Sequence, residues 1–356
     1  MPTNLKDVPL PPGFDQAYQL VGDPNGSGVW FLSEAGTTSL QPHILHWNSA
    51  TSSLQSWQLP TTEGLGGSLN GIAVDAGGAV WAGLGDQLFE LTSPDAPSVS
   101  PAIPLPDVGD ATLAEASLPS PAVAYIQAHH PVTAIASDGQ GDVAIGRQDA
   151  DSIQIFHSAS HSFESVPLPA GTTESSLAFD ADGVVAAGLI DAVHQTADAT
   201  LFLGKSGFSQ VFDVPVSAIH VDQSGTSFIV SDPAEGVVSR VADTATAASP
   251  VVPAALPVAA SEADGASPGA DLVSTGQYSV YPTDSGLAVA STGGGLSLFR
   301  FPTYDCASKA GGFPVGNGPC KAVATAVTVD KAGNIWYESS GPGYPIGYIP
   351  PSSYGA

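Results

Sequence analysis

The stretch AVDAGGAVW, residues 73–81, places an aspartate three residues before a glycine and continues with apolar residues. The same pattern returns five more times, as VGDPNGSGVW (21–30), ASDGQGDVA (136–144), AFDADGVVA (178–186), HVDQSGTSF (220–228) and TVDKAGNIW (328–336). An Asp that accepts bonds from backbone amides and a Gly with positive φ form a tight turn between two strands. The sequence therefore predicts one structural unit repeated along the chain.

The spacing of these turns gives the number of units. Successive aspartates are separated by 52, 63, 42, 42 and 108 residues, and a degenerate copy, DSGLAVAS (284–291), divides the last gap. Each unit continues with a third apolar strand and a fourth that closes in a motif such as SVPLP. Four short strands in roughly 45 residues are typical of a β-propeller blade. We expect an all-β, seven-bladed β-propeller with four-stranded blades, one domain over residues 1–356, with insertions at 107–130 and 258–280.

The two ends of the chain complement each other. The seventh unit, AVTVDKAGNIWYESSGPGYPIGYIPP (326–351), supplies only three strands, whereas residues 5–11, LKDVPLP, match the fourth strand of the other units. We expect residues 5–11 to pair in the last blade and close the ring, because closure removes exposed sheet edges.

Composition excludes several classes of partner. With 8 Lys+Arg against 34 Asp+Glu the net charge is −26, which repels the phosphate backbone of nucleic acids and anionic membrane surfaces. The most apolar long run, residues 244–261, contains three prolines and is not a membrane span. We expect a monomer that binds a small molecule, a glycan or a protein.

The two cysteines suggest a cellular location. Cys306 and Cys320 lie 14 positions apart in a Gly/Pro-rich segment, where a disulfide would close a loop without regular structure. Two free thiols are the alternative. A disulfide predicts an extracellular or cell-surface protein. No secretion signal opens the chain, so export requires a signal ahead of Met1.

Two stretches, GIAVDAGGAVW (71–81) and VTVDKAGNIWYESSGPGYPIGYI (327–349), resemble the repeats of the virginiamycin B (streptogramin) lyase family of NHL-type propellers. The resemblance implies the propeller fold, and the family's lyase reaction uses Mg²⁺ with a His/Glu/His set. Glu338 in WYESSG matches that Glu, but Ala324 and Ser340 stand where the resemblance places the histidines. The resemblance therefore implies the propeller fold, but the two histidines of the lyase reaction are missing from this sequence.

Candidate site residues lie in the loops that enter each inner strand or join the second strand to the third, because these loops open on one face around the channel. On that face we place Asn70, His129, His130, Glu34, Asp86, Arg147, Asp149, Asp151, Asp191, Asp232 and Glu338. Asn70, His129, Arg147, Asp149 and Asp232 are the candidate ligand contacts. Glu34, Glu338 and Asn70 offer an oxygen-lined site for Ca²⁺ or Mg²⁺; solvated acids on an acidic surface are the alternative.

Other recurring residues have structural interpretations. The D-x-x-G aspartates repeat once per blade at the same turn, and Trp30, Trp81 and Trp336 occupy equivalent positions, which indicates turn chemistry and packing between blades. Adjacent side chains on a strand point to opposite sides, so at most one of His129 and His130 should reach the channel. His220 is predicted to be a core or channel histidine.

Two functions remain open. The first is an exported, non-catalytic propeller that binds its ligand through the loop face. The second is a metal-dependent lyase or lactonase in which Glu34, Glu338 and Asn70 hold the ion and His130 is the base, with His130 and Glu338 as the candidate catalytic residues.

The predicted disulfide has a direct test. Thiol titration of the denatured, unreduced protein should find no reactive thiol, and titration after reduction should find both Cys306 and Cys320. Two reactive thiols without reduction would contradict the disulfide and remove the main argument for export.

Overall fold

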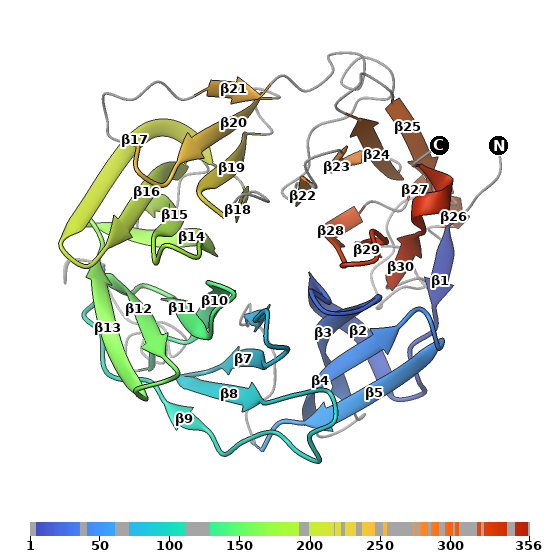
Figure 1. Cartoon of the computed structure of the whole chain (residues 1–356), viewed down its shortest axis with the longest axis horizontal. Coiled ribbons are helices and arrows are strands. Elements are labelled where there is room, and N and C mark those ends of the chain that lie inside the picture. The colour runs from blue at the N-terminus through green and yellow to red at the C-terminus, as the bar shows by residue number, and fades with distance from the viewer. Residues whose placement is uncertain are drawn as a thin grey trace.

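The chain forms seven four-stranded antiparallel sheets arranged radially around a central channel (Figure 1), which confirms the predicted seven-bladed propeller. This computed structural model describes residues 5–35, 41–60, 71–111, 129–191, 199–216, 218–221, 225–232, 237–245, 252–254, 273–274, 278–283, 286–291, 296–301, 303–305, 319–321, 324–339 and 346–354. Within these ranges, no helix is long and apolar enough to span a membrane.

The first four blades, each ordered from the channel outward, follow the predicted repeats. Blade 1 is β2 (Phe14–Gly22), β3 (Gly28–Ala35), β4 (Gln41–Asn48) and β5 (Ser53–Gln58). Blade 2 is β6 (Ile72–Val74), β7 (Val80–Leu84), β8 (Gln87–Leu91) and β9 (Ile103–Pro104). Blade 3 is β10 (Val132–Ser137), β11 (Asp142–Arg147), β12 (Ser152–His157) and β13 (Ser162–Pro167). Blade 4 is β14 (Thr172–Phe179), β15 (Val185–Asp191), β16 (Ala199–Lys205) and β17 (Phe208–Val216).

The remaining blades include one irregular sheet. Blade 5 is β18 (Ala218–Val221), β19 (Ser227–Asp232), β20 (Val237–Ala242) and β21 (Val252–Ala254). Blade 6 is β22 (Val273–Ser274), β23 (Tyr278–Thr283), β24 (Gly286–Ser291) and β25 (Leu296–Arg300), followed by the hairpin of β26 (Thr303–Asp305) and β27 (Pro319–Lys321). Blade 7 is β28 (Ala324–Val329), β29 (Ile335–Ser339), β30 (Ile346–Ile349) and β1 (Lys6–Val8), and a short 3-10 helix, Pro351–Ser353, follows β30. The predicted insertion 258–280 thus contains β22 and the first residues of β23.

The N-terminal strand closes the ring. β1 pairs antiparallel with β30, Lys6 opposite Tyr348 and Val8 opposite Ile346, and so supplies the outer strand of blade 7. The Val8 side chain is 1% exposed and packs in one cluster with Trp336, Ile346 and Phe31. Both the pairing and its location in the last blade confirm the prediction made from residues 5–11.

The D-x-x-G turns have the expected chemistry. Asp138 Oδ1 accepts hydrogen bonds from the backbone amides of Gln140, Gly141 and Asp142 at 2.7, 3.0 and 3.0 Å, and Gly141 has φ +115°. Asp330 uses Oδ1 for the amide of Asn334 at 2.8 Å and Oδ2 for Trp336 Nε1 at 3.0 Å. These carboxylates accept hydrogen bonds from groups of their own blades, so they are turn residues and not metal ligands.

Among the residues that the structure describes, the buried apolar clusters join neighbouring blades. Successive side chains of a second strand point to opposite neighbours: Trp30 packs with Phe89 of blade 2, and Phe31 packs with Trp336 of blade 7. Trp30, Trp81 and Trp336 are at most 1% exposed, which confirms their packing role. Because both faces of these strands are buried, their sequences are continuously apolar.

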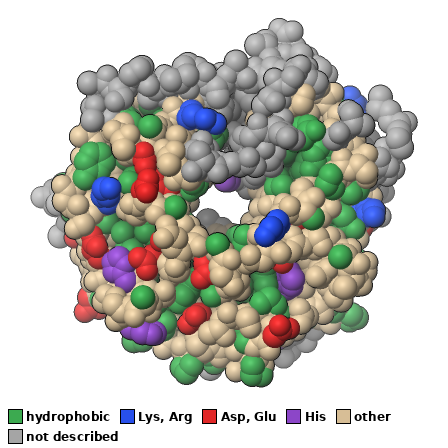
Figure 2. All heavy atoms as spheres, in the orientation of Figure 1, with side chains coloured by type: hydrophobic (Ala, Val, Ile, Leu, Met, Phe, Trp, Pro, Cys, Tyr) green, Lys and Arg blue, Asp and Glu red, His purple; other side chains and the backbone are tan. Residues whose placement is uncertain are grey.

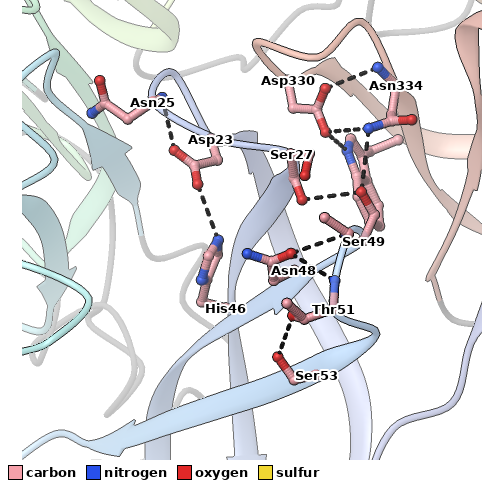
Figure 3. Close-up of polar contacts among 12 residues, drawn as sticks. Asp23, Asn25, Ser27, His46, Asn48, Ser49, Thr51, Ser53, Asp330 and Asn334 are labelled. Carbon is pink, nitrogen blue, oxygen red and sulfur yellow. Dashed lines mark hydrogen bonds and ion pairs between the residues drawn. The ribbon is translucent and has the colours of Figure 1, made fainter.

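Polar contacts reinforce the junction of blades 7 and 1 (Figure 3). Asn334 Nδ2 donates to Ser49 Oγ at 3.3 Å, and the Lys331 amide donates to the Asp23 carbonyl at 3.0 Å. Within blade 1, His46 Nε2 lies 3.2 Å from the Oδ2 atom of the same Asp23 (Figure 3). The first and last blades are therefore joined on their turn side as well as through β1.

Removal of residues 1–12 should expose the edge of β30 and a face of the Val8 cluster. We expect a lower melting temperature and soluble aggregates in size-exclusion chromatography with light scattering, because an open sheet edge invites pairing with other chains. Removal of residues 1–4 alone, the matched control, should change neither. A monomeric 13–356 chain with an unchanged melting temperature would contradict closure by β1.

Candidate functional site

The inner strands surround a central cavity of about 540 Å³. Figure 2 shows that the centre of the ring is open on the face toward the viewer. The wall combines apolar and hydroxyl-bearing side chains, with His220 among them as predicted. The lining residues are Gln19, Leu20, Val21, Ile72, Thr133, Ala134, Ile135, Ser175, Ser176, Leu177, Ala218, Ile219, His220, Thr325, Ala326, Val327 and Thr328. Its size suits a small organic ligand.

Three inner strands bulge at the same position. The register shifts between Val132 and Ala134 in β10, between Glu174 and Ser176 in β14, and between Ala324 and Ala326 in β28. The extra residues are Thr133, Ser175 and Thr325, which we call the bulge hydroxyls, and all three line the cavity. Bulges re-aim side chains and are frequent beside functional sites. The bulges lie toward the ends of these strands where the loops between second and third strands open.

Behind Thr133 lies a buried acid, Glu174 of β14. The Thr133 hydroxyl donates to Glu174 Oε1 across the junction of blades 3 and 4, and the glutamate is 6% exposed. A Cβ on Gly146 would come within 2.6 Å of that oxygen, so a larger residue there would displace the Glu174 side chain. Burial raises the pKa of Glu174 to about 7, against the opposing effect of its hydrogen bonds.

A second glutamate, Glu338, bonds the bulge hydroxyl of Thr325, here within a single blade, blade 7. It lies on β29 opposite Ala326, and the Thr325 hydroxyl hydrogen-bonds its carboxyl group. Burial raises the pKa of Glu338 to about 7, and the Thr325 bond opposes this shift. Two of the bulge hydroxyls, those of Thr133 and Thr325, are therefore each hydrogen-bonded to a glutamate with a pKa of about 7.

Arg147 was a candidate ligand contact, but its guanidinium is directed at the backbone. It is 3% exposed and donates to the carbonyl oxygens of Pro106, His129 and His130, each at 2.6 Å. Its side chain therefore joins the two flanks of residues 107–130. The described ends of that segment are also tied to blade 3, since the Ala111 amide donates to the Asp149 carbonyl at 2.8 Å.

The histidine pair lies beside this arginine and outside the cavity lining. His130 is 6% exposed; its Nδ1 is 3.0 Å from the Gln148 carbonyl and its Nε2 is 3.3 Å from Asp110 Oδ1. His129 is partly exposed, with Nδ1 3.5 Å from Asp86 Oδ2. Both ring nitrogens of His130 are thus directed at protein acceptors of the loop face, and neither is directed at the cavity.

The predicted metal site is only partly described. Glu34 is buried at the end of β3, Glu338 lies on β29, and Asn70 falls outside the described residues. Across the described chain, no group of three or more His, Cys, Asp or Glu side chains is arranged to hold a metal ion. Asp232 ends β19, but its side chain is not described; Cys306 also lies outside the described residues, so the predicted metal site and disulfide remain predictions.

The bulge hydroxyls were missed by the sequence analysis, although a signal for them exists. The residue five positions before the turn aspartate carries a hydroxyl or an amide in every repeat: Tyr18, Asn70, Thr133, Ser175, Ser217, Ser279 and Thr325. In blade 6 this residue, Ser279, lies on the second strand, β23. Aligning the repeats on the aspartate reveals this polar position, whereas the bulge itself follows only from the strand register. Glu174 gives no sequence signal, because it occurs in a single blade.

The chain matches no protein-family model and no curated protein, but solved structures share its fold. A streptogramin B lyase structure matches with TM-score 0.62 and 13% identity over 97% of this chain and 96% of that chain. The fold is virginiamycin B lyase-like. A catalytically inactive histidine-to-alanine variant of virginiamycin B lyase from Staphylococcus aureus, with quinupristin, gives TM-score 0.61 and 12% identity over 97% and 98% of the two chains. YCF48 bound to D1 peptide gives 0.54 and 11% over 97% and 95%. Identities this low establish the fold alone.

Glu174 should make stability depend on pH. Its pKa is about 7 in the folded chain and 4.5 ordinarily, so between these values the folded state holds a proton that the unfolded state has released. The free energy of unfolding should therefore fall as pH rises from about 4.5 to 7, by up to about 3 kcal/mol from this group.

Urea unfolding of wild type and Glu174→Gln at pH 5 and pH 8 measures this contribution. The variant should lose less stability than wild type between the two pH values, because the amide does not ionise. Asp95→Asn, on an exposed loop of blade 2, is the control and should keep the wild-type difference. An unchanged pH dependence in Glu174→Gln would show that Glu174 is ionised in the folded chain.

Proposed function

We propose that this propeller binds a small ligand in the central channel, at the end where the bulge hydroxyls lie, and catalyses no reaction there. The observation that carries the proposal is the coincidence of three bulges at one position, each placing a hydroxyl on the wall of the 540 Å³ cavity. Regular pairing would suffice for structure alone, and a repeated departure from it at the cavity supports a binding role.

The residues around the channel support binding more than catalysis. Ala324 and Ser340 occupy the positions where the family resemblance places histidines, and a histidine-to-alanine change leaves the S. aureus lyase catalytically inactive. His130, the candidate base, contacts Gln148 and Asp110 outside the cavity lining. A glycan or a protein segment remains a second kind of ligand, since YCF48, a neighbour in fold, binds a peptide.

One observation favours the enzyme as a second candidate. The pKa of Glu338, raised by burial to about 7, suits a group that exchanges a proton at neutral pH. In a metal-dependent lyase or lactonase, Glu34, Glu338 and Asn70 would hold Ca²⁺ or Mg²⁺, and the ion would polarise an ester carbonyl. Such an ion should raise the melting temperature of the wild type but not of Glu338→Gln.

We further propose that the protein acts outside the cell. Support comes from the spacing of Cys306 and Cys320 and from the low charge content of the chain, of which only 12% is Asp, Glu, Lys or Arg.

A channel-filling substitution tests the binding site. Ligand-observed NMR of wild type with a fragment library should yield binders that lose at least tenfold in affinity in Ser175→Trp, because an indole there would occupy the cavity. Ser160→Trp, on the exposed turn between β12 and β13, is the control and should bind them as wild type does. Equal binding to all three proteins would place the site elsewhere and contradict the proposal.

A further inference from the structure

We propose that the channel recognises a small organic cation, an alkylammonium ion, whose N–H groups bond to Thr133 and Thr325 while Glu174 and Glu338 supply the compensating negative charge. This inference rests on the proposed binding function and specifies the chemistry of its ligand. Three features of the channel favour this ligand: the direction of two hydrogen bonds, the charge around the cavity and the apolar wall next to the bulge hydroxyls.

The hydrogen bonds determine what the two threonines offer a ligand. A hydroxyl has one donor and two acceptor positions. Thr133 donates its hydrogen to Glu174, and Thr325 is bonded in the same way to Glu338. With their hydrogens directed at the carboxylates, both oxygens present only lone pairs to the cavity. A ligand that binds there must donate, and ammonium donates without accepting.

Charge favours a cationic donor over a neutral one. The described lining contains no Lys or Arg, and the whole chain carries 8 Lys+Arg against 34 Asp+Glu. The net field therefore attracts cations and repels anions. Each threonine lies between the cavity and a carboxylate, so a bound ammonium group is one hydroxyl away from a negative charge. Charge-assisted hydrogen bonds of this kind are stronger than neutral ones.

The wall next to the bulge hydroxyls suits an alkyl chain. Along the same inner strands, Ile135, Leu177, Ile219 and Val327 line the cavity. Burial of methylene groups against them contributes about 0.8 kcal/mol per CH₂. An ammonium head with an alkyl tail therefore matches the wall better than a bare metal ion.

The two acceptor pairs lie across the channel from one another. Glu174 and Thr133 belong to the junction of blades 3 and 4, whereas Glu338 and Thr325 belong to blade 7, and β14 and β28 face each other across the opening (Figure 1). A ligand with an ammonium group at each end would engage both pairs at once. A diamine should therefore bind more tightly than a monoamine.

Calorimetric titration at pH 8, above the pKa of about 7 of both glutamates, tests the inference with four probes. 1-Hexanol and hexylamine share the same alkyl chain and differ in the head group, a hydroxyl in one and an ammonium in the other. 1,6-Hexanediamine has a second ammonium group, and adipate carries the opposite charge. We expect hexylamine to bind at least tenfold more tightly than 1-hexanol, the diamine more tightly still, and adipate not at all.

Variants assign the effect to the proposed residues. Glu338→Gln and Glu174→Gln should each reduce hexanediamine affinity about tenfold or more, and Thr133→Val and Thr325→Val provide the same test if a glutamate variant does not fold. Glu164→Gln, on the outer strand β13, is the charge-matched control and should bind as wild type does.

The outcomes separate the two proposals. Equal affinities for hexylamine and 1-hexanol, both abolished by Ser175→Trp, would overturn cation recognition and leave the channel as a binding site. Amine binding that persists in Ser175→Trp would overturn both. Failure of all four probes to bind would overturn cation recognition, whatever the fragment screen shows.

Discussion

The pairing of β1 with β30 is the constraint on which the structure depends. Among the described residues, the buried apolar clusters lie between blades, and Trp30 and Phe31 of one strand pack against opposite neighbours. Blade 1 therefore needs blade 7 as its neighbour, and blade 7 needs an outer strand. Three residues near the N-terminus, Lys6–Val8, supply that strand and join the two ends of the ring. A closed ring is the only arrangement in which every blade has two neighbours.

Closure also fixes the geometry of the channel. The inner strands cannot move outward independently, because each is hydrogen-bonded to a second strand whose side chains are locked between blades. The bulges of the inner strands are therefore held in fixed positions on the channel wall. The bulges at Thr133, Ser175 and Thr325 hold their hydroxyls on the cavity wall, and Glu174 spans the junction of two blades to reach one of them. The rigid ring makes the site preorganised.

The sequence predicted what repeats and missed what occurs once. The D-x-x-G turns, the tryptophans between blades and the closing strand were all predictable, because each is specified by local chemistry at a recurring position. Glu174 was not, since burial at the junction with blade 3 raises its pKa, and its neighbours there, Gly146 and Thr133, are brought to it only by folding. Arg147 was predicted on the ligand-binding face as part of a loop that joins a second strand to a third, yet its guanidinium donates to three backbone carbonyl groups that folding brings together. A charged residue that occurs in only one repeat has no counterpart in the other repeats, so comparing the repeats does not predict its hydrogen-bond partners.

The central claim is that the bulge hydroxyls of Thr133 and Thr325 bind the ligand and select it by its N–H groups. A crystal structure of the protein soaked with 1,6-hexanediamine tests it most directly. The account predicts elongated density in the channel, with its ends within hydrogen-bond distance of Thr133 Oγ1 and Thr325 Oγ1. Density confined to the outer surface of the ring, or a channel occupied only by water at saturating diamine, would contradict it.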